Sequence, residues 1–260
     1  MNKELRPTIS VITVVRNGAS VLADCIDSVL AQKIDGLEYI VIDGASTDGT
    51  LNVIQRYEDA ISVIISEPDH GLYDAMNKGL RLARGRYIHF LNADDRYYSP
   101  DTLRQLLPHL NENTICYGAM IYQETDGRQR HLGSPFSWER ELTESHIPQP
   151  TLFVPNKLYR EVGEFNLTYR IAADYDMVLR LARHFPVHFV DQPVTLMTAG
   201  GISYTQMGRT FKEAARVSIS HGRPTVAAYL TYLRHMITWQ VAQHLPVSFI
   251  EVWRRFRRRA

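Results

Sequence analysis

Cysteine is rare in this 260-residue sequence, which contains only Cys25 and Cys116. Each lies in an apolar segment, so we expect two buried, reduced thiols and no disulfide framework. Long hydrophobic runs are also missing, because no apolar stretch reaches the roughly 18 residues of a membrane-spanning helix. The opening MNKELRPTIS has no apolar core of the kind that marks a signal peptide. Together these absences predict a protein of the reducing cytoplasm.

A large excess of either charge is missing as well. Lysine and arginine number 29 and aspartate and glutamate 28, which gives a formal net charge of +1. A general nucleic-acid-binding protein is usually basic, so we expect no nucleic-acid partner. The basic residues are nevertheless unevenly placed, because five of the last seven residues are arginine.

Two common nucleotide-binding motifs are absent from the place where they would be expected. ISVITVV, residues 9–15, is rich in β-branched residues and predicts a buried strand. The sequence that follows is RNGAS, which is neither a G-x-G-x-x-G loop nor a Walker A loop ending in Gly-Lys. An NAD-dependent enzyme and a P-loop NTPase are therefore disfavoured. Arg16 and Asn17 keep two interpretations, a polar turn or a contact with a nucleotide.

Strands and helices alternate over the first 110 residues. Helical segments separate the apolar strands that are predicted at 9–15, 37–43, 61–66 and 86–91. Such alternation implies parallel strands joined by helical crossovers, so the fold class is α/β. Later segments predict a hairpin at Asp126-Gly127 and short strands at 187–191 and 194–198. The chain then reads as helices at about 206–221, 225–244 and 247–258.

Acidic residues stand where several of these strands end, at Asp43, Asp69, Asp94 and Asp95. In an open α/β sheet, the carboxyl ends of the strands border the crevice where ligands bind. Carboxylates gathered there repel one another unless a cation neutralises them. Mg²⁺ and Mn²⁺ bind carboxylates together with phosphate oxygens. The arrangement therefore suggests a metal-assisted site for a phosphorylated substrate.

Simpler roles remain open for some of these residues. Asp43 could cap the next helix, although Ser46 could do so and leave Asp43 free for a base or ribose. Asp74 and Lys78 could form an i,i+4 surface pair instead of contacting phosphate.

Asp174, at the start of a predicted helix, is the candidate general base, with a helix cap as its alternative. The dipole of that helix would hold its carboxylate ionised, which suits a group that takes a proton from a hydroxyl. Asp176 is expected to cap the helix or to contact the acceptor. His146 also has a structural alternative.

Five segments follow one another in a fixed order: ISVITVVRN, EYIVIDGASTDGT, SEPDHGLYDAMNKG, GRYIHFLNADD and AADYDMVLRLA. This set, within about residues 8–203, resembles the ordered motifs of family 2 glycosyltransferases. The resemblance is greatest to bacterial members that build capsule, colanic acid, exopolysaccharide or O-antigen. It implies a GT-A fold, with a Rossmann-like, mostly parallel sheet flanked by helices and a C-terminal helical extension. It also implies a nucleotide-diphosphate-sugar donor (UDP favoured, GDP the alternative), a divalent metal (Mn²⁺ or Mg²⁺) and inversion at the anomeric carbon.

The resemblance assigns roles residue by residue. The residues expected to bind the nucleotide sugar are Val15, Arg16, Asn17, Asp43, Ala45, Ser46, Asp69, Gly71, Asp74, Asn77, Lys78, Asn92, Ala93 and Asp94. Asp94 and Asp95 are the expected metal ligands and Asp174 the catalytic base. The expected acceptor and donor-sugar pocket contains His146, Gln149, Ala173 and Asp176, and a loop at 200–203 resembles one that closes near the diphosphate.

Two positions depart from the family pattern. Asn92 stands in the first position of the D-x-D motif, and Ala173 replaces the usual glutamate before the base. The first departure keeps open a non-catalytic, membrane-docked scaffold protein as an alternative function. A sugar nucleotidyltransferase is the other alternative, although it would be expected to carry a glycine-rich, lysine-containing loop after the first strand.

We expect residues 1–203 to form the glycosyltransferase domain, with about 8–98 binding the nucleotide sugar and 99–203 the acceptor. Residues 204–260 form the helical extension, where aromatic and aliphatic residues alternate with arginines. This composition suits a helix on an anionic bilayer, or a packed helix with a solvated basic tail. The expected function is transfer of a sugar to a saccharide acceptor, lipid-linked in our preferred interpretation, at the cytoplasmic face of the inner membrane.

Overall fold

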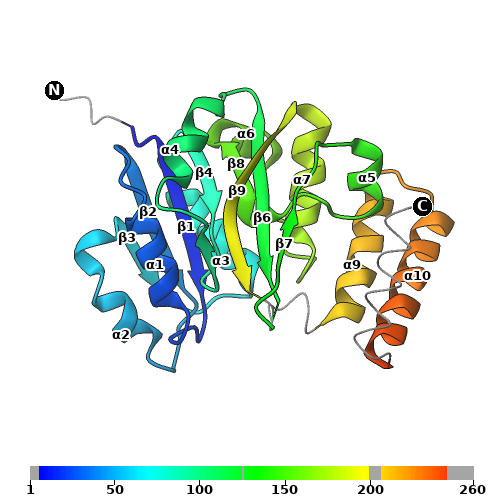
Figure 1. Cartoon of the computed structure of the whole chain (residues 1–260), viewed down its shortest axis with the longest axis horizontal. Coiled ribbons are helices and arrows are strands. Elements are labelled where there is room, and N and C mark those ends of the chain that lie inside the picture. The colour runs from blue at the N-terminus through cyan, green and yellow to red at the C-terminus, as the bar shows by residue number, and fades with distance from the viewer. Residues whose placement is uncertain (1–5, 125, 199–205, 245–260) are drawn as a thin grey trace.

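The computed structural model describes residues 6–124, 126–198 and 206–244. There, one sheet of nine strands carries helices on both faces (Figure 1). The strands are β1 (Ile9–Val15), β2 (Leu37–Asp43), β3 (Val63–Ser66), β4 (Tyr87–Phe90), β5 (Asp95–Tyr97), β6 (Ile115–Gln123), β7 (Gln129–Leu132), β8 (Leu152–Pro155) and β9 (Val187–Thr198). The α-helices are α1 (Leu22–Leu30), α2 (Thr50–Gln55), α3 (Leu72–Leu82), α4 (Thr102–Leu106), α5 (Trp138–Thr143), α6 (Asn156–Val162), α7 (Ala173–His184), α9 (Met207–Ser220) and α10 (Thr225–His244).

The sheet has the order β3-β2-β1-β4-β8-β6-β9-β5, with β7 paired to β6. Its first four strands are parallel, as their alternation with helices predicted. β8 then runs antiparallel to both β4 and β6, while β6 and β9 are parallel. The Asp126-Gly127 turn joins the antiparallel strands β6 and β7, so the predicted hairpin is confirmed.

Helices cover both faces of the parallel strands because apolar residues point to alternate sides. Along β1, Val11 belongs to one buried cluster, together with residues of α1 and α4. Its neighbour Ile12 belongs to the other cluster, with residues of α3 and α7. Successive side chains of a strand face opposite ways, so a continuous apolar run serves two layers. Cys25 and Cys116 are both buried and unpaired, as expected.

The carboxyl ends of the first strands lie level with one another. Val15 on β1 pairs with Asp43 on β2, and Asp43 pairs with Ser66 on β3. Phe90, at the end of β4, pairs with Ile12. The loops after these strands therefore meet at one edge of the sheet, where parallel α/β sheets bind ligands.

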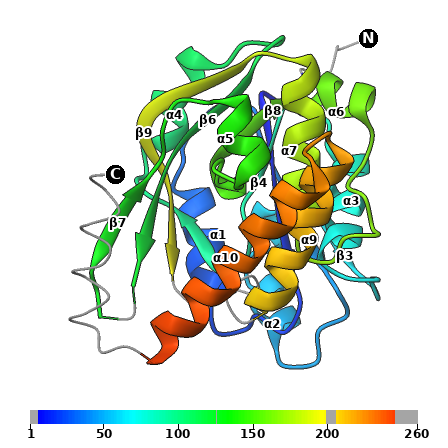
Figure 2. The ribbon, with the colours of Figure 1, turned by 90° about the vertical axis from the view of Figure 1, so that its right-hand side faces the viewer.

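The C-terminal helices pack side by side at the end of the molecule away from β3 (Figures 1 and 2). α9 contacts α7, and its fully buried Val217 joins the same core cluster as Leu179 of α7. α9 and α10 agree with the predicted bounds, whereas the helix predicted at 247–258 lies outside the described residues. Among the helices that the structure describes, none combines the length and hydropathy needed to cross a membrane.

Candidate active site

A cavity of about 1040 Å³ opens at the carboxyl edge of the parallel strands. One wall comes from the loops after β1 and β4 and the turn before α3; the second wall comes from the start of α3, β7, α5, the segment before β8 and the start of α7. Predicted site residues that line it are Val15, Arg16, Asn17, Asp69, Gly71, Asn92, Ala93, Asp94, His146, Gln149 and Asp174. The cavity thus joins residues that lie as far apart in the chain as 15 and 174.

Two strand-end loops are fastened together on the first wall. Asn17 adopts a left-handed backbone conformation (φ 53°), which asparagine tolerates better than most residues. Its Oδ1 accepts a hydrogen bond from the Thr47 N–H at 2.9 Å, and its own N–H donates to Ser46 Oγ at 2.8 Å. Gly18 N–H donates to Thr50 Oγ1 at 2.9 Å. These bonds fix the backbone on which Arg16 is presented to the cavity.

Asp43 is buried behind this loop. Its Oδ2 accepts hydrogen bonds from Ser46 N–H at 3.1 Å and Ser66 Oγ at 2.7 Å, and its Oδ1 accepts one from Ser46 Oγ. These contacts support the local role that was left open for Asp43. Neither Asp43 nor Ala45 nor Ser46 lines the cavity, and their contact with a nucleotide stays a prediction.

Asp69 is held against the loop after β2. A Cβ atom added to Gly44 would lie 2.1 Å from Asp69 Oδ2, so only glycine allows this approach. Asp69 Oδ1 accepts a hydrogen bond from Gly71 N–H at 2.9 Å. Gly71 has φ 121° and ψ 175°, a conformation that is essentially restricted to glycine. The turn that starts α3 is thus built around the Asp69 carboxylate.

Three predicted nucleotide contacts on α3 lie outside the cavity lining. Lys78 pairs with Glu67 at 2.9 Å and with Asp74 at 4.0 Å, and donates to the Pro68 carbonyl at 2.8 Å. Asn77 is buried and exchanges two hydrogen bonds with the Phe165 backbone, at 2.8 and 3.0 Å. The structure therefore gives these residues protein partners, with Glu67 nearer to Lys78 than Asp74 is, and their contact with a nucleotide stays a prediction.

The two adjacent carboxyl groups after β4 have opposite environments. Asp94 is exposed and lines the cavity, beside Asn92 and Ala93. Asp95 is 1 % exposed and does not line the cavity; its Oδ2 accepts a hydrogen bond from Asn92 Nδ2 at 3.2 Å. Burial and the charge of Asp94 raise the pKa of Asp95 well above its usual value. The expectation that both carboxylates face one cavity is therefore corrected, because consecutive residues here point to different sides.

The donor set still suits a metal that is held largely by substrate. In the described part of the chain, no group of three or more His, Cys, Asp or Glu side chains is placed to hold a metal ion. Asp94 offers carboxylate oxygens and Asn92 an amide at the cavity wall. Mg²⁺ characteristically takes one or two carboxylates and completes its shell with phosphate and water. These residues fit such an ion only together with a diphosphate.

Asp174 lines the second wall, at the N-terminus of α7. Its Oδ1 is a hydrogen-bond acceptor for the hydroxyl of Tyr73 at 2.9 Å and for the N–H of Tyr175 at 2.9 Å. Burial raises the pKa of Asp174 above its usual value, although these hydrogen bonds work in the other direction. Desolvation thus works against the ionised state that the helix dipole was expected to favour. A carboxylate with a raised pKa is a stronger base, nearer to the operating pH of an enzyme.

Ala173 and Asp176, the other two residues predicted for this wall, do not line the cavity. Ala173 is fully buried in the core. Asp176 accepts hydrogen bonds from Arg180 Nε and pairs with His221 Nε2, both at 2.9 Å. The helical period turns Asp176 away from Asp174, so its role is to join helices.

Neither Tyr73 nor Glu141 was among the residues predicted from the sequence. Tyr73 lies on the buried side of α3. Glu141 on α5 is 1 % exposed, and its Oε2 accepts hydrogen bonds from the N–H groups of His146 and Ile147 at 3.0 and 3.1 Å. Burial raises its pKa to about 7. Glu141 thereby holds the cavity-lining segment that includes His146. The loop predicted at 200–203 lies outside the described residues.

The sequence model described as "Glycosyl transferase family 2" matches residues 10–171. A PGL/p-HBAD biosynthesis glycosyltransferase of Mycobacterium tuberculosis is 34 % identical over 180 residues, covering 67 % of this chain and 69 % of the relative. An uncharacterized glycosyltransferase of the same organism is 32 % identical over 233 residues, covering 84 % and 85 %.

Solved structures of two proteins share the fold at low sequence identity. Staphylococcus aureus TarS 1–349 in complex with UDP has a TM-score of 0.62 and 18 % identity, and the alignment covers 95 % of this chain and 78 % of that one. In a longer TarS structure, 43 % of that chain is covered. A mannosyltransferase from Pyrobaculum calidifontis in complex with GDP-Man and Mn²⁺ has a TM-score of 0.61 and 19 % identity, covering 96 % and 79 %. The α/β architecture described above is thus the GT-A fold.

Proposed function

Because the chain belongs to glycosyl transferase family 2 and has the GT-A fold, we propose that it is an inverting glycosyltransferase using a nucleotide-diphosphate-sugar donor. The observation that carries this proposal is the single cavity in which Asp69, Asn92 and Asp94 lie on one wall and Asp174 on the other. A donor needs polar groups for its nucleotide and diphosphate at one end. An acceptor hydroxyl needs a base at the other.

The first wall is suited to the donor. UDP is bound by TarS and GDP-Man by the Pyrobaculum enzyme, and we favour a UDP-sugar here. Arg16 supplies a positive charge at the cavity, while the Asp69 carboxylate is placed to accept hydrogen bonds from the nucleoside. Asp94, with Asn92 beside it, would hold Mn²⁺ or Mg²⁺ together with the diphosphate. When bound, that ion stabilises negative charge on the departing diphosphate.

The second wall is suited to the acceptor. An acceptor hydroxyl attacks the anomeric carbon from the face opposite the phosphate, so a carbon–oxygen bond forms as the sugar–phosphate bond breaks. The nucleoside diphosphate leaves with the electron pair of the broken bond, and the hydroxyl proton moves to an Asp174 oxygen. Proton transfer to a positioned carboxylate typically contributes about 10²–10⁴-fold to the rate.

Donor turnover by the purified chain tests this assignment. We expect release of nucleoside diphosphate from a UDP- or GDP-sugar with Mn²⁺, and loss of about 10²–10⁴-fold in Asp174→Ala with donor binding retained. Asp94→Ala should weaken metal-dependent donor binding. Asp101→Ala is a matched control, because Asp101 pairs with Arg104 on the surface at 2.6 Å and does not line the cavity.

Three outcomes would count against the assignment. Turnover that survives both Asp94→Ala and Asp174→Ala would reject it. Donor binding without any turnover would favour the scaffold alternative. Formation of a sugar nucleotide from a nucleoside triphosphate and a sugar phosphate would favour a nucleotidyltransferase.

The acceptor, we further propose, is a lipid-linked saccharide at an anionic membrane surface, which the C-terminal helices contact. Exposed apolar residues recur along one face of α10: Val226, Leu230, Leu233, Ile237 and Val241. Residues 206–260 contain ten basic and two acidic residues, whereas residues 1–205 contain nineteen and twenty-six. Exposed apolar side chains on α10, together with a basic C-terminal sequence, are suited to anionic lipid.

Vesicle sedimentation tests the membrane proposal. We expect binding to phosphatidylglycerol vesicles that falls with salt, and weaker binding in Leu230→Asp/Leu233→Asp. Leu82→Asp is the control, since Leu82 is an exposed leucine on α3, far along the chain from α10. Equal binding of the double variant and the parent would refute the assignment of α10.

A further inference from the structure

Glu213 lies on α9, beyond the residues that match the family, yet its carboxylate contacts the segment that leads into α7. The side chain is buried, and its Oε2 accepts hydrogen bonds from three consecutive N–H groups: Arg170 at 2.8 Å, Ile171 at 2.8 Å and Ala172 at 3.3 Å. Its Oε1 accepts a hydrogen bond from Arg209 at 3.0 Å. One carboxylate therefore binds all three peptide groups that precede α7.

Those peptide groups are directly connected to Asp174. The carbonyl of Ile171 accepts a hydrogen bond from Tyr73 at 2.7 Å, and the same hydroxyl lies 2.9 Å from Asp174 Oδ1. Ala172 is the last residue before α7, and its carbonyl accepts the Asp176 N–H at 3.1 Å. A displacement of this segment would therefore move both Asp174 and the hydroxyl that contacts it.

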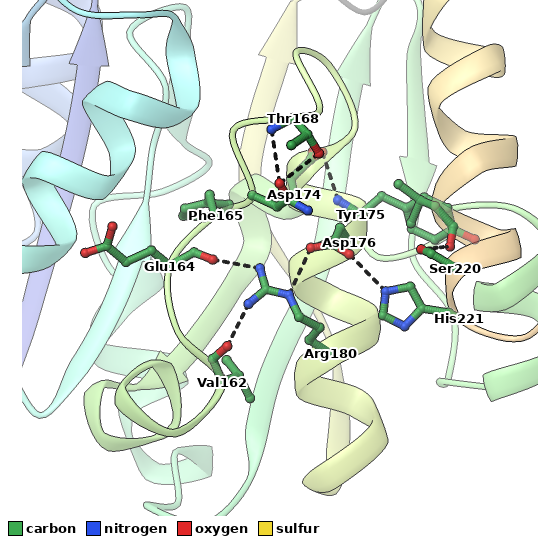
Figure 3. A network of polar contacts seen from close by, with 12 residues as sticks. Val162, Glu164, Phe165, Thr168, Asp174, Tyr175, Asp176, Arg180, Ser220 and His221 are labelled. Carbon is green, nitrogen blue, oxygen red and sulfur yellow. Dashed lines mark hydrogen bonds and ion pairs between the residues drawn. The ribbon is translucent and has the colours of Figure 1, made fainter.

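A second connection joins the same two helices. His221, at the end of α9, lies 2.9 Å from Asp176, which Arg180 also binds (Figure 3). Arg180 also donates hydrogen bonds to the carbonyls of Val162 and Glu164, both at 2.8 Å. Burial alone would raise the pKa of Asp176, but His221 and Arg180 more than offset it and hold that pKa below its usual value. Asp176 is thus an ionised connection between α7 and α9.

We propose that Glu213 is a positioning residue for Asp174, so that α9 is part of the support of the active site and not a separate appendage. A carboxylate suits this place because charge-assisted hydrogen bonds are stronger than neutral ones. Burial would raise the pKa of Glu213, but the three backbone donors and Arg209 lower it overall, so the group stays ionised. The inference rests on the proposed function only in taking Asp174 as the base.

Hydrogen exchange tests the contact without reference to activity. In Glu213→Ala, the amides of residues 170–172 should lose protection, while those of β1 remain protected. Glu213→Gln keeps an acceptor oxygen and should show a smaller loss. Lys212→Ala is the control on α9, because Lys212 is exposed and adjacent in sequence. Unchanged protection at 170–172 in Glu213→Ala would overturn the inference.

Kinetics test the consequence for Asp174. A misplaced catalytic group can cost about 10²-fold, so we expect kcat in Glu213→Ala to fall by about 10- to 100-fold with unchanged donor affinity. A loosened segment admits water to Asp174, whose pKa is raised by burial, so the acid limb of the kcat–pH profile should move to lower pH. Tyr73 and Glu141, whose pKa values the Asp174 charge raises, are not altered in this variant.

Val217→Ala separates positioning from general destabilisation. Val217 is fully buried on α9 but makes none of the hydrogen bonds to the segment before α7, so its truncation weakens packing alone. The acid limb of the kcat–pH profile of Val217→Ala should match that of the parent. An equal shift of the acid limb in Val217→Ala, or no shift in Glu213→Ala, would overturn the inference. Failure of the proposed function would appear differently, as absence of donor turnover in the parent while hydrogen exchange still reports on the contact.

Discussion

Tyr73→Phe removes one oxygen atom from the wall that carries Asp174. In the parent, that hydroxyl lies 2.9 Å from Asp174 Oδ1 and 2.7 Å from the Ile171 carbonyl, and the Tyr73 ring is 4 % exposed. A hydroxyl donates one hydrogen, so it is shared between the two acceptors. A hydrogen bond to a charged group is worth about 1.5–3 kcal/mol, and sharing places this one near the lower value. We therefore expect about a tenfold fall in kcat on the acid limb of the kcat–pH profile, where the ionised fraction of Asp174 limits the rate.

The direction of the pH effect follows from the same contact. The Tyr73 hydroxyl lowers the pKa of Asp174, in opposition to the burial that raises it. Its removal should raise that pKa further, so the acid limb of the kcat–pH profile moves to higher pH. The activity of a base is lost as pH falls through its pKa, and more of Asp174 would then be protonated at neutral pH.

The assay is steady-state nucleoside diphosphate release between pH 5 and pH 9. Tyr159→Phe is the matched control. Tyr159 packs near the ring of Phe165, with 6.4 Å between the two ring centroids, but it does not line the cavity. Donor affinity should not change in either variant. An acid limb that stays in place or moves to lower pH in Tyr73→Phe would refute the reasoning.

Three further predictions concern residues that lie behind the cavity lining. Gly44→Ala should weaken donor binding in calorimetry, because its Cβ would lie 2.1 Å from Asp69 Oδ2 and displace that carboxylate; unchanged affinity would contradict the role of Asp69. Asp95→Asn should retain most metal-dependent activity because Asp95 is buried and does not line the cavity, whereas Asp94→Asn should lose it; equal losses would restore Asp95 as a ligand. Burial raises the pKa of Glu141 from 4.5 to about 7, so the folded protein binds a proton that the unfolded chain releases, and stability falls as pH rises through that window. Glu141→Gln should therefore lose less stability than the parent between pH 5 and pH 8, by on the order of 1–3 kcal/mol, and parallel thermal-unfolding curves for the two proteins would contradict this.

The parallel half of the fold could be predicted from the sequence because its signals are local. Apolar strands alternate with amphipathic helices, and the Asp126-Gly127 turn marks its hairpin without help from distant residues. The strand pair expected at 187–191 and 194–198 is instead one strand, β9, which continues past Pro193. Register shifts between β6 and β9 accommodate the proline there, and that depends on a partner strand seventy residues away.

Site residues could be predicted where the position of the backbone determines whether they line the cavity. They were harder to predict where the direction of the side chain determines this. Asp69, Asp94 and Asp174 line one cavity, as their places at element ends suggested. Asp95 differs from Asp94 by one residue and points into the protein. Glu213 could not have been found from a motif, because its partners are backbone N–H groups about forty residues away in the chain.

One face of α3 supplies three contacts to the stretch between α6 and α7. Tyr73, Asn77 and Arg81 follow one another at intervals of four residues; Asn77 binds the Phe165 backbone and Arg81 binds Glu164 at 2.7 and 2.8 Å. The same helix begins at the turn built on Asp69, where the donor is proposed to bind. A nucleotide that shifts this turn would therefore also shift α3, whose other contacts extend to Asp174. Donor binding would thus influence the position of Asp174, which accepts the proton. Such a connection would favour an ordered mechanism in which the donor binds before the acceptor.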